Sequence, residues 1–582
     1  MTFFEEKFLA LIRSLTPKRV FLILFTVGFV VYMDSFVAGM FWDDYDSVVN
    51  NQYIRSFDHF PDYFTKNLTA GAGITDNYWR PLLLVSFATD YAVGGIEPFF
   101  YHFQNFAWHL VAGILVFLVG TKLFRNKTAS LVAALLFLVH PLQTEAVTYV
   151  AGRADPMHTA LMLGSLFLFL RHLESKKYPL LLSSLALFTL SLLAKERAVI
   201  LPIVLALLLF LVPFEGYART WKQKFLLLSP YVAIASLYTL LRMTVLHFAD
   251  TFDPGATTIL QSTTFWEKIL VFLAGIGTYG KLIVWPDHLY MEKTLPLPHS
   301  IFDPMVILGI IILALSAMLI FSSFKRKQAV AFCLFAFFVT LLPSMYVYPV
   351  QGLLYEHWLY PALPWLFLAI GIGLSDYLDG TKRIRQIPTA FPLLFMMIVI
   401  TAFGIRTIVR NFDWQNPIRF YEKNISLGGN SGRVSTNLGM AYDDAHLPDK
   451  AIVAYRAAVD LSGNTLFQPW YDMGNTLSQQ GKTDEAFEAY HQASVLNPRF
   501  VATYLNIAKI YADRKDAGKA ISVLKDAEGN DPGQIQILYA IAVISANAGD
   551  TDTAAIYANK ILVIDPGNAQ AEQIFSFIRS HR

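Results

Sequence analysis

The pattern of apolar and polar positions changes near residue 411. Before it, apolar runs of about twenty residues recur, which is the length an α-helix needs to cross a bilayer core. After it, apolar residues recur at the spacing of ordinary amphipathic helices. The pattern predicts an all-α chain with a polytopic membrane domain over 1–410, an aromatic linker over 411–429 and a soluble domain over 430–582.

Eleven of the apolar runs are predicted to cross the membrane. They cover residues 20–40, 98–121, 129–141, 157–171, 178–194, 198–213, 225–246, 301–323, 328–348, 354–376 and 388–409. A twelfth run, 265–285, has a polar start and contains Gly275, Gly277 and Gly280. We predict that it is a re-entrant or interfacial helix.

Basic residues in the loops support this topology, because Lys and Arg concentrate on the cytoplasmic side. The six basic segments contain Lys7, Arg13, Lys18 and Arg19; Lys122, Arg125 and Lys127; Arg171, Lys176 and Lys177; Arg219, Lys222 and Lys224; Lys325, Arg326 and Lys327; and Lys382, Arg383 and Arg385. All six fall on one side if 265–285 does not cross. The chain is then a multi-pass protein with a cytoplasmic N-terminus. Its C-terminal domain lies on the other side of the membrane, which is the periplasm or another extracytoplasmic space, or the ER lumen in a eukaryote.

The C-terminal domain repeats with a period of 34 residues. The four units cover 432–465, 467–500, 501–534 and 535–568. In the second unit, Trp470, Gly474, Tyr490 and Pro498 occupy positions of the tetratricopeptide (TPR) pattern. We therefore predict an α-solenoid of about four TPR repeats, whose concave surface binds a protein or peptide. A passive spacer or a dimerisation module is the alternative.

Composition agrees with this division. The chain of 582 residues is 55% hydrophobic and 15% charged, with a net charge of +2. These values exclude a single soluble domain, a disordered chain and a protein that binds nucleic acid through bulk charge. One cysteine, Cys333, excludes a disulfide framework.

Ionisable residues at the ends of spans tend to mark function, and here they collect on the outer side. Asp43, Asp44 and Asp46 follow the first span. Because three close acids repel one another, at least one could have a raised pKa suited to a general base. An acidic cap exposed to solvent is the alternative.

Further outer clusters contain both acids and bases. They are Arg80; His140 and Glu145; Arg153 and Asp155; Lys195, Glu196 and Arg197; Asp287 and His288; and Glu356 and His357. The turn at 195–197 is either a short hydrophilic hairpin or a cationic site for a phosphate group. His140 has no partner at metal-ligand spacing, so we predict neither a metal nor another cofactor.

This layout suits one class of chemistry. The polar clusters face away from cytosolic ATP, so an activated donor must arrive through the membrane. A polyprenyl-phosphate sugar meets this condition. An outer carboxylate would take a proton from the acceptor hydroxyl, and Arg or Lys would stabilise the departing phosphate.

The motifs also occur in a familiar order. They are an acidic pair after the first span, Tyr-Trp-Arg-Pro-Leu (78–82), His-Pro-Leu-Gln-Thr-Glu-Ala-Val (140–147), Gly-Arg-Ala-Asp (152–155), Ala-Lys-Glu (194–196), Glu-His-Trp-Leu-Tyr-Pro (356–361) and the repeats. This order resembles the transmembrane and tetratricopeptide-repeat-containing O-mannosyltransferases, which have the GT-C glycosyltransferase fold. The resemblance implies transfer of mannose from a dolichyl-phosphate donor to Ser or Thr of a protein on the outer or luminal face.

The resemblance also assigns residues. It implies that Asp43 or Asp44 is the base, and it matches His140, Glu145, Lys195 and Glu196 to family motifs. The family's Lys-Glu-x-Gly is Lys-Glu-Arg-Ala here, and its usual Glu-Arg is Glu356-His357. The short repeat domain indicates a prokaryotic relative with an undecaprenyl-like donor lipid.

The main hypothesis is thus an inverting, metal-independent glycosyltransferase of EC class 2.4.1. Two alternatives are transfer to a glycan or lipid A, and a non-enzymatic scaffold or lipid transporter that presents the repeats. In the main hypothesis, cations hold the donor phosphate and acids orient hydroxyl groups. The cations are Arg80, Arg153, Lys195 and Arg197, and the acids are Glu145, Asp155 and Glu356.

Overall fold

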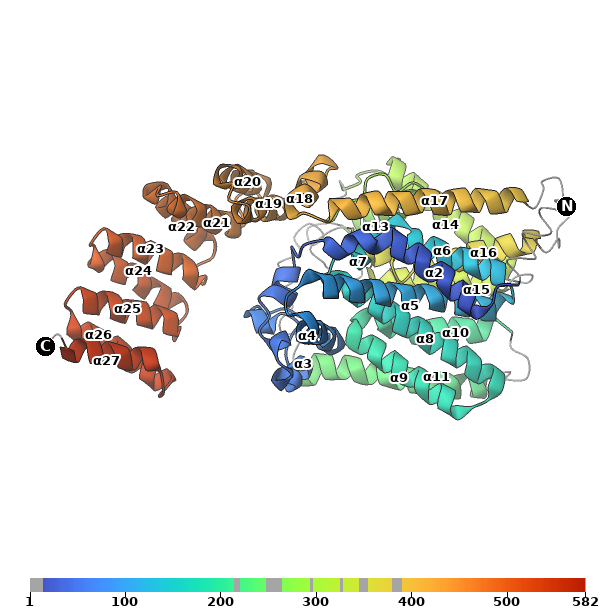
Figure 1. Cartoon of the computed structure of the whole chain (residues 1–582), viewed down its shortest axis with the longest axis horizontal. Helices are drawn as coiled ribbons and strands as arrows, with labels where there is room; N and C mark the ends of the chain where they lie inside the picture. The colour runs from blue at the N-terminus through green and yellow to red at the C-terminus, as the bar shows by residue number, and fades with distance from the viewer. Residues whose placement is uncertain are drawn as a thin grey trace. The chain divides into compact units, whose positions relative to one another are not determined.

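The computed structural model describes residues 14–213, 220–246, 264–293, 297–324, 328–344, 354–378 and 390–580. Within these ranges the chain is helical, and its one extended pairing is an isolated bridge between Lys293 and Leu354. This confirms the all-α prediction. Contacts divide the chain into two compact units, Met1–Phe420 and Tyr421–Arg582 (Figure 1).

The first unit is a bundle of apolar helices joined by short turns. Its helices are α2 (Pro17–Tyr32), α3 (Phe60–Thr65), α4 (Pro81–Gly94), α5 (Pro98–Phe124), α6 (Lys127–Val139), α7 (Thr144–Val147), α8 (Ala154–Ser175), α9 (Tyr178–Ala194), α10 (Leu201–Leu211), α11 (Trp221–Leu240), α13 (Phe265–Val284), α14 (Pro304–Ser323), α15 (Gln328–Leu341), α16 (Leu363–Leu378) and α17 (Ala390–Asp413). In this bundle α5 packs against α2, α6 and α8, and α8 packs against α9 (Figure 1).

Five helices in the described ranges are long and apolar enough to cross a membrane. They are Pro17–Val37, Pro98–Leu123, Trp221–Thr244, Pro304–Ser323 and Phe391–Asp413. A bent pair, Lys127–Val139 with Pro141–Val147, would make a sixth. The first unit is therefore a multi-pass membrane unit, and the predicted total of eleven spans stays a prediction.

The predicted span over 354–376 begins later in the structure. Residues Glu356–Leu359 form a 3-10 turn, and α16 starts only at Leu363. Pro361 lies between them and has no N–H to continue a helical ladder. The turn is therefore left free to present side chains.

The run that we predict not to cross forms one uninterrupted helix, α13. Its polar start is a capping box, in which Thr264 and Glu267 satisfy each other's backbone N–H groups. It packs tightly on α14, since a Cβ built on Gly277 would lie 2.0 Å from the Met305 carbonyl oxygen. Whether α13 crosses the membrane stays a prediction.

The basic segments bear on orientation only in part. Arg219 and the segments at 325–327 and 382–385 lie outside the described residues, as do Lys7 and Arg13. The predicted orientation of the termini therefore stays a prediction.

The second unit contains four helix pairs and a final helix. The pairs are α19 (Gly432–Asp444) with α20 (Pro448–Leu461), α21 (Gln468–Gln479) with α22 (Thr483–Leu496), α23 (Val501–Asp513) with α24 (Ala517–Asn530), and α25 (Ile535–Asn547) with α26 (Thr551–Ile564), followed by α27 (Ala569–Ser580). Each predicted repeat corresponds to one pair. Glycines allow two of the pairs to close: a Cβ on Gly439 or Gly474 would lie 2.4 or 2.6 Å from the ring of Tyr455 or Tyr490. α18 (Pro417–Ser426) runs across the division between the units.

Candidate active site

The two neighbouring acids after the first span have different surroundings. Asp44 is 1% exposed, and its two oxygens accept hydrogen bonds from the backbone N–H groups of Ala151 (2.7 Å) and Phe41 (3.2 Å). Asp43 is partly exposed, and its backbone N–H donates to the Tyr149 hydroxyl (3.0 Å). Asp44 therefore links its own loop to the segment at Ala151 through hydrogen bonds, whereas Asp43 lies nearer to solvent.

The backbone around these acids is unusual. Trp42 has a φ of 61°, in the left-handed region that non-glycine residues seldom adopt. Burial raises the pKa of Asp44 to about 8, although the two backbone donors and Arg153 oppose the rise. The acid with the raised pKa that the sequence indicated is thus Asp44, which is the buried member of the pair.

Arg80 and Glu196 form a bidentate ion pair between two distant segments. Arg80 Nε lies 3.1 Å from Glu196 Oε2, and Arg80 Nη2 lies 2.8 Å from Glu196 Oε1. Burial would raise the pKa of Glu196, but Arg80 more than compensates and holds it below the usual range. The guanidinium of Arg80 also lies over the ring of Tyr78, 4.4 Å from its centroid, and Tyr78 is within electrostatic reach of Asp43. This pair therefore stands close to the acidic loop.

The neighbouring residues Lys195 and Arg197 differ in how they are paired. Lys195 Nζ lies 2.7 and 2.8 Å from the two oxygens of Asp155, and both side chains are nearly inaccessible. Arg197 lies over Trp358, 5.2 Å from the ring centroid, and within reach of the charges of Asp155 and Glu196. Its buried Nη1 has no hydrogen-bond partner in the described part of the chain. Arg197 therefore has a donor left that could bind a further anion.

Glu145 organises the turn that carries Glu356 and His357. Its carboxylate accepts hydrogen bonds from the backbone N–H of Glu356 (2.9 Å) and of His357 (3.3 Å), and His357 Nδ1 lies 2.6 Å from it. Glu356 in turn binds Lys293 Nζ at 2.9 Å. Glu145 and Glu356 are fully buried, whereas the His357 side chain is 20% exposed. Of these side chains, His357 is the one that can meet a substrate.

Arg153 and His140 are engaged inside the protein. The Arg153 guanidinium donates to Asn105 (2.6 Å), Ser86 (2.7 Å) and the Tyr101 carbonyl (2.8 Å), pairs with Asp90 at 2.6 Å, and also contacts Gln104. His140 Nε2 lies 3.0 Å from the Ile283 carbonyl, and its Nδ1 accepts from the Leu142 N–H. Both side chains are thus held by protein groups, and the prediction that Arg153 holds the donor phosphate stays a prediction.

The remaining predicted residues come together in one region. Asp155 is within electrostatic reach of Lys195, His357 and Arg197. Arg197 is in turn within electrostatic reach of Arg80 and Glu196. Five separate segments thus converge. They are the acidic loop after α2, the start of α4, the start of α8, the turn between α9 and α10, and the turn before α16. Within the described residues no group of three or more His, Cys, Asp or Glu side chains is arranged to hold a metal ion.

Sequence reasoning missed three cations in this region. Lys293 binds Glu356, Arg242 is within electrostatic reach of Glu196, and the fully buried Arg410 lies 3.9 Å from Glu356 Oε2. Arg410 carried a usable signal. It stands at the predicted outer end of the last span, on the side where basic residues are depleted. Lys293 follows Asp287 and His288 by a few residues, so that cluster could have been extended.

Comparison with known proteins agrees with the motif order. A family model described as dolichyl-phosphate-mannose-protein mannosyltransferase matches residues 92–241, and a TPR repeat model matches 474–515. Protein O-mannosyl-transferase TMTC3 of Homo sapiens is 23% identical over 514 residues, which cover 81% of this chain and 54% of its own length. The chain is thus similar to the protein O-mannosyl-transferases. The expected family resemblance is thereby confirmed.

One further relative and one solved structure are similar to parts of the chain. Protein O-mannosyl-transferase Tmtc1 of Drosophila melanogaster is 28% identical over 288 residues, which cover 46% of this chain and 33% of that protein. The crystal structure of MamA is 26% identical, covers 26% of this chain and 87% of its own, and has a TM-score of 0.24. The chain spans about half the length, or less, of these curated relatives.

Proposed function

We propose that this chain is an inverting, metal-independent glycosyltransferase. It moves mannose or another hexose from a polyprenyl phosphate to Ser or Thr hydroxyls of a protein on the non-cytoplasmic face. The observation that carries the proposal is the convergence of five segments, in which a partly exposed Asp43 lies within electrostatic reach of Tyr78, whose ring is covered by Arg80. A carboxylate base and phosphate-binding cations are the groups that such a transfer needs.

In this mechanism Asp43 is the general base. Its carboxylate takes the proton from the acceptor hydroxyl as that oxygen attacks the anomeric carbon of the sugar. The bond between this carbon and the phosphate oxygen breaks, and the phosphate leaves with both bonding electrons. Attack opposite the leaving group inverts the configuration. Asp44 fixes the loop through its two backbone hydrogen bonds.

Arg197 stabilises the leaving phosphate. Its Nη1 is a buried donor without a hydrogen bond among the described residues, so a phosphate oxygen would satisfy it. Arg80 already shares two hydrogen bonds with Glu196, and Lys195 is bound to Asp155. These two pairs hold the turn at 195–197 in place and add positive potential beside it.

The repeats select the acceptor protein in this proposal. Stacked TPR helix pairs present a concave surface of the kind that usually binds peptides. The four pairs of the second unit supply such a surface. Transfer to a glycan or lipid A would give no glycopeptide, so the reaction product separates this function from the alternative.

The test is a transfer assay with the full chain in detergent, a synthetic polyprenyl-phosphate mannose and candidate peptides, with the products identified by mass spectrometry. We expect Asp43→Asn to lower kcat by about 10²–10⁴-fold. The matched control is Asp46→Asn, an acid of the same loop, which should transfer at the wild-type rate. Wild-type activity in Asp43→Asn would overturn the base assignment. If the wild-type chain transfers no sugar when it is incubated with donor and acceptor, the proposed function is wrong.

A further inference from the structure

A second feature of the membrane unit is a cluster of aromatic rings beside the acidic loop. It consists of Phe41, Tyr149, Trp414 and Phe420, and we refer to these four residues as the aromatic clamp. All four are buried. They belong to the first compact unit, which ends at Phe420. The clamp thus joins three segments of this unit, which are the loop after α2, the segment after α7 and the junction of α17 with α18.

Trp414 lies at the centre of the clamp. The centroid of its ring is 4.5 Å from that of Phe420, 5.7 Å from that of Phe41 and 5.8 Å from that of Tyr149. The guanidinium of Arg410 lies over the same ring, 5.7 Å from its centroid. Buried aromatic rings at such separations attract one another beyond the effect of the area they bury. Trp414 therefore ties Phe41 and Tyr149 to the end of α17.

The clamp reaches Asp43 by two routes. The Tyr149 hydroxyl accepts a hydrogen bond from the Asp43 backbone N–H (3.0 Å), and Phe41 stands two residues before Asp43 in the chain. The segment that carries Tyr149 is itself held, because the Asn105 side-chain amide donates to the carbonyls of Tyr149 (2.8 Å) and Val147 (3.1 Å). A fixed ring therefore sets the position of the Asp43 backbone.

We propose that the aromatic clamp positions the general base, and that Tyr149 and Trp414 are its positioning residues. This inference rests on the proposed function and adds to it a role for the segment over 411–429, which the sequence predicted to be a linker. Both rings are buried, so Tyr149 acts through the Asp43 backbone and Trp414 acts through Tyr149 and Phe41. A small displacement of a reacting group lowers the rate of the chemical step steeply.

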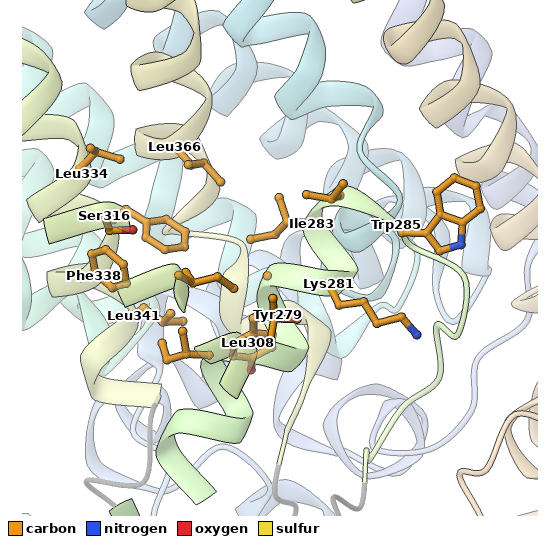
Figure 2. A pocket seen from close by; sticks show the side chains of 15 residues that line it. Tyr279, Lys281, Ile283, Trp285, Leu308, Ser316, Leu334, Phe338, Leu341 and Leu366 are labelled. Atoms are coloured by element: carbon orange, nitrogen blue, oxygen red, sulfur yellow. The ribbon is translucent and has the colours of Figure 1, made fainter. Parts of the chain in front are cut away.

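Substitutions in the clamp do not alter the walls of two apolar cavities in the same unit. One, of about 480 Å³, lies among α13, α14, α15 and α16 (Figure 2), and none of the described residues that line it belongs to the clamp. The other is a groove of about 620 Å³ lined by α10, α11 and the turns that adjoin them, and it shares none of its described lining residues with the clamp either. A clamp variant should therefore change kcat through the acidic loop and leave KM unchanged.

The first experiment measures hydrogen exchange of the full chain in detergent, without substrate. Tyr149→Phe keeps the ring beside Trp414 but removes the hydroxyl that accepts the Asp43 N–H. We expect the Asp43 amide, followed in overlapping peptides by mass spectrometry, to exchange about tenfold faster in this variant. The matched control is Tyr231→Phe, since Tyr231 is also fully buried and its hydroxyl is hydrogen-bonded to that of Ser184. It should leave exchange at Asp43 as in the wild type.

The second experiment measures sugar transfer. We expect Tyr149→Phe to lower kcat about tenfold and Trp414→Ala about 100-fold, each with KM for donor and peptide nearly unchanged. Trp414→Phe keeps an aromatic ring beside Phe41 and should recover most of the loss. The control for lost packing is Phe169→Ala, because Phe169 is fully buried on α8, about four helical turns from Asp155. Its kcat should stay at the wild-type value.

The two measurements separate the possible failures. An unchanged kcat in Tyr149→Phe would overturn the positioning role even if exchange at Asp43 is faster, while transfer by the wild type would still support the function. Equal losses of kcat in Trp414→Ala and Phe169→Ala, or a rise in KM alone, would also overturn it. If Trp414→Ala does not fold, Tyr149→Phe decides. A wild-type chain that transfers no sugar would overturn the proposed function, and with it the positioning of a base.

Discussion

The two units each contain an ion pair between a lysine and an aspartate, and the two pairs differ in solvent exposure. In the membrane unit, Lys195 and Asp155 are 5% and 1% exposed, whereas in the repeat unit Lys519 and Asp516 are 66% and 38% exposed. Burying a pair costs desolvation that only good geometry recovers, and exposed pairs contribute little. The Lys195–Asp155 pair therefore has a desolvation cost that the exposed Lys519–Asp516 pair does not have.

Removing one lysine from each pair should give the largest contrast. We expect Lys195→Met to lower the stability by about 3–5 kcal/mol, because it leaves Asp155 buried without its partner. Lys519→Met should change it by less than about 1 kcal/mol. Thermal unfolding of both variants in the same detergent measures the difference. Similar shifts in the two would show that burial does not separate the pairs.

Replacing a closely packed glycine with alanine in each unit compares how tightly their helices pack. In Gly277→Ala the new carbon would meet a backbone carbonyl at 2.0 Å, whereas in Gly474→Ala it meets the ring edge of Tyr490 at 2.6 Å. The ring can shift and the backbone cannot, so we expect a loss of about 3 kcal/mol for Gly277→Ala and about 1–2 for Gly474→Ala. Melting temperatures report both. The controls are Gly373→Ala and Gly529→Ala, which have nothing within 4 Å of the new carbon, and they should be neutral or stabilising.

The acidic loop gives a smaller, pH-dependent effect. The pKa of Asp44 is raised from 3.8 to about 8, so the folded state favours its neutral form. This contribution is complete below about pH 4 and is lost as the pH rises through 8. We expect the melting temperature of the wild type to fall over this range more steeply than that of Asp44→Asn, which cannot titrate. Parallel curves would contradict the raised pKa.

We expect the smallest effect from Asp472 in the repeat unit, whose pKa is also raised. Burial raises the pKa of Asp472 to about 7; Gln468 opposes this and Asp443 adds to it. Its stabilising contribution should therefore be lost as the pH rises from about 4 through 7, earlier than for Asp44. Comparing the wild type with Asp472→Asn in the full chain isolates this change. A difference between the two proteins that does not change between pH 4 and pH 7 would contradict the raised pKa of Asp472.

Much of this organisation could be read from the sequence. The repeats were predictable because a short, local period fixes each helix pair, and Gly439 and Gly474 mark where its helices touch. The polar residues at the ends of the predicted spans were predictable as a set, because charges at span ends are costly. Both signals depend on neighbours along the chain.

The partners of the charges could not be predicted in the same way. Arg80 meets Glu196 across 116 residues and Glu145 meets His357 across 212, and nothing local specifies such pairs. The same limit left Asp43 and Asp44 equivalent in the sequence, until Ala151 showed which of them is tied down. Arg153 was predicted to be available to the donor phosphate, because its partners Asp90 and Asn105 lie on other segments, α4 and α5.

The left-handed backbone of Trp42 has a consequence for the residue that follows it. A non-glycine residue is held at such a φ only when its surroundings over-determine it, and Trp42 is buried. Asp43 is thus given its direction once, when the chain folds, and the loop has little freedom left to lose when an acceptor arrives. In the proposed reaction, with Asp43 as the base, this would remove part of the entropy of reaching the transition state before any substrate binds.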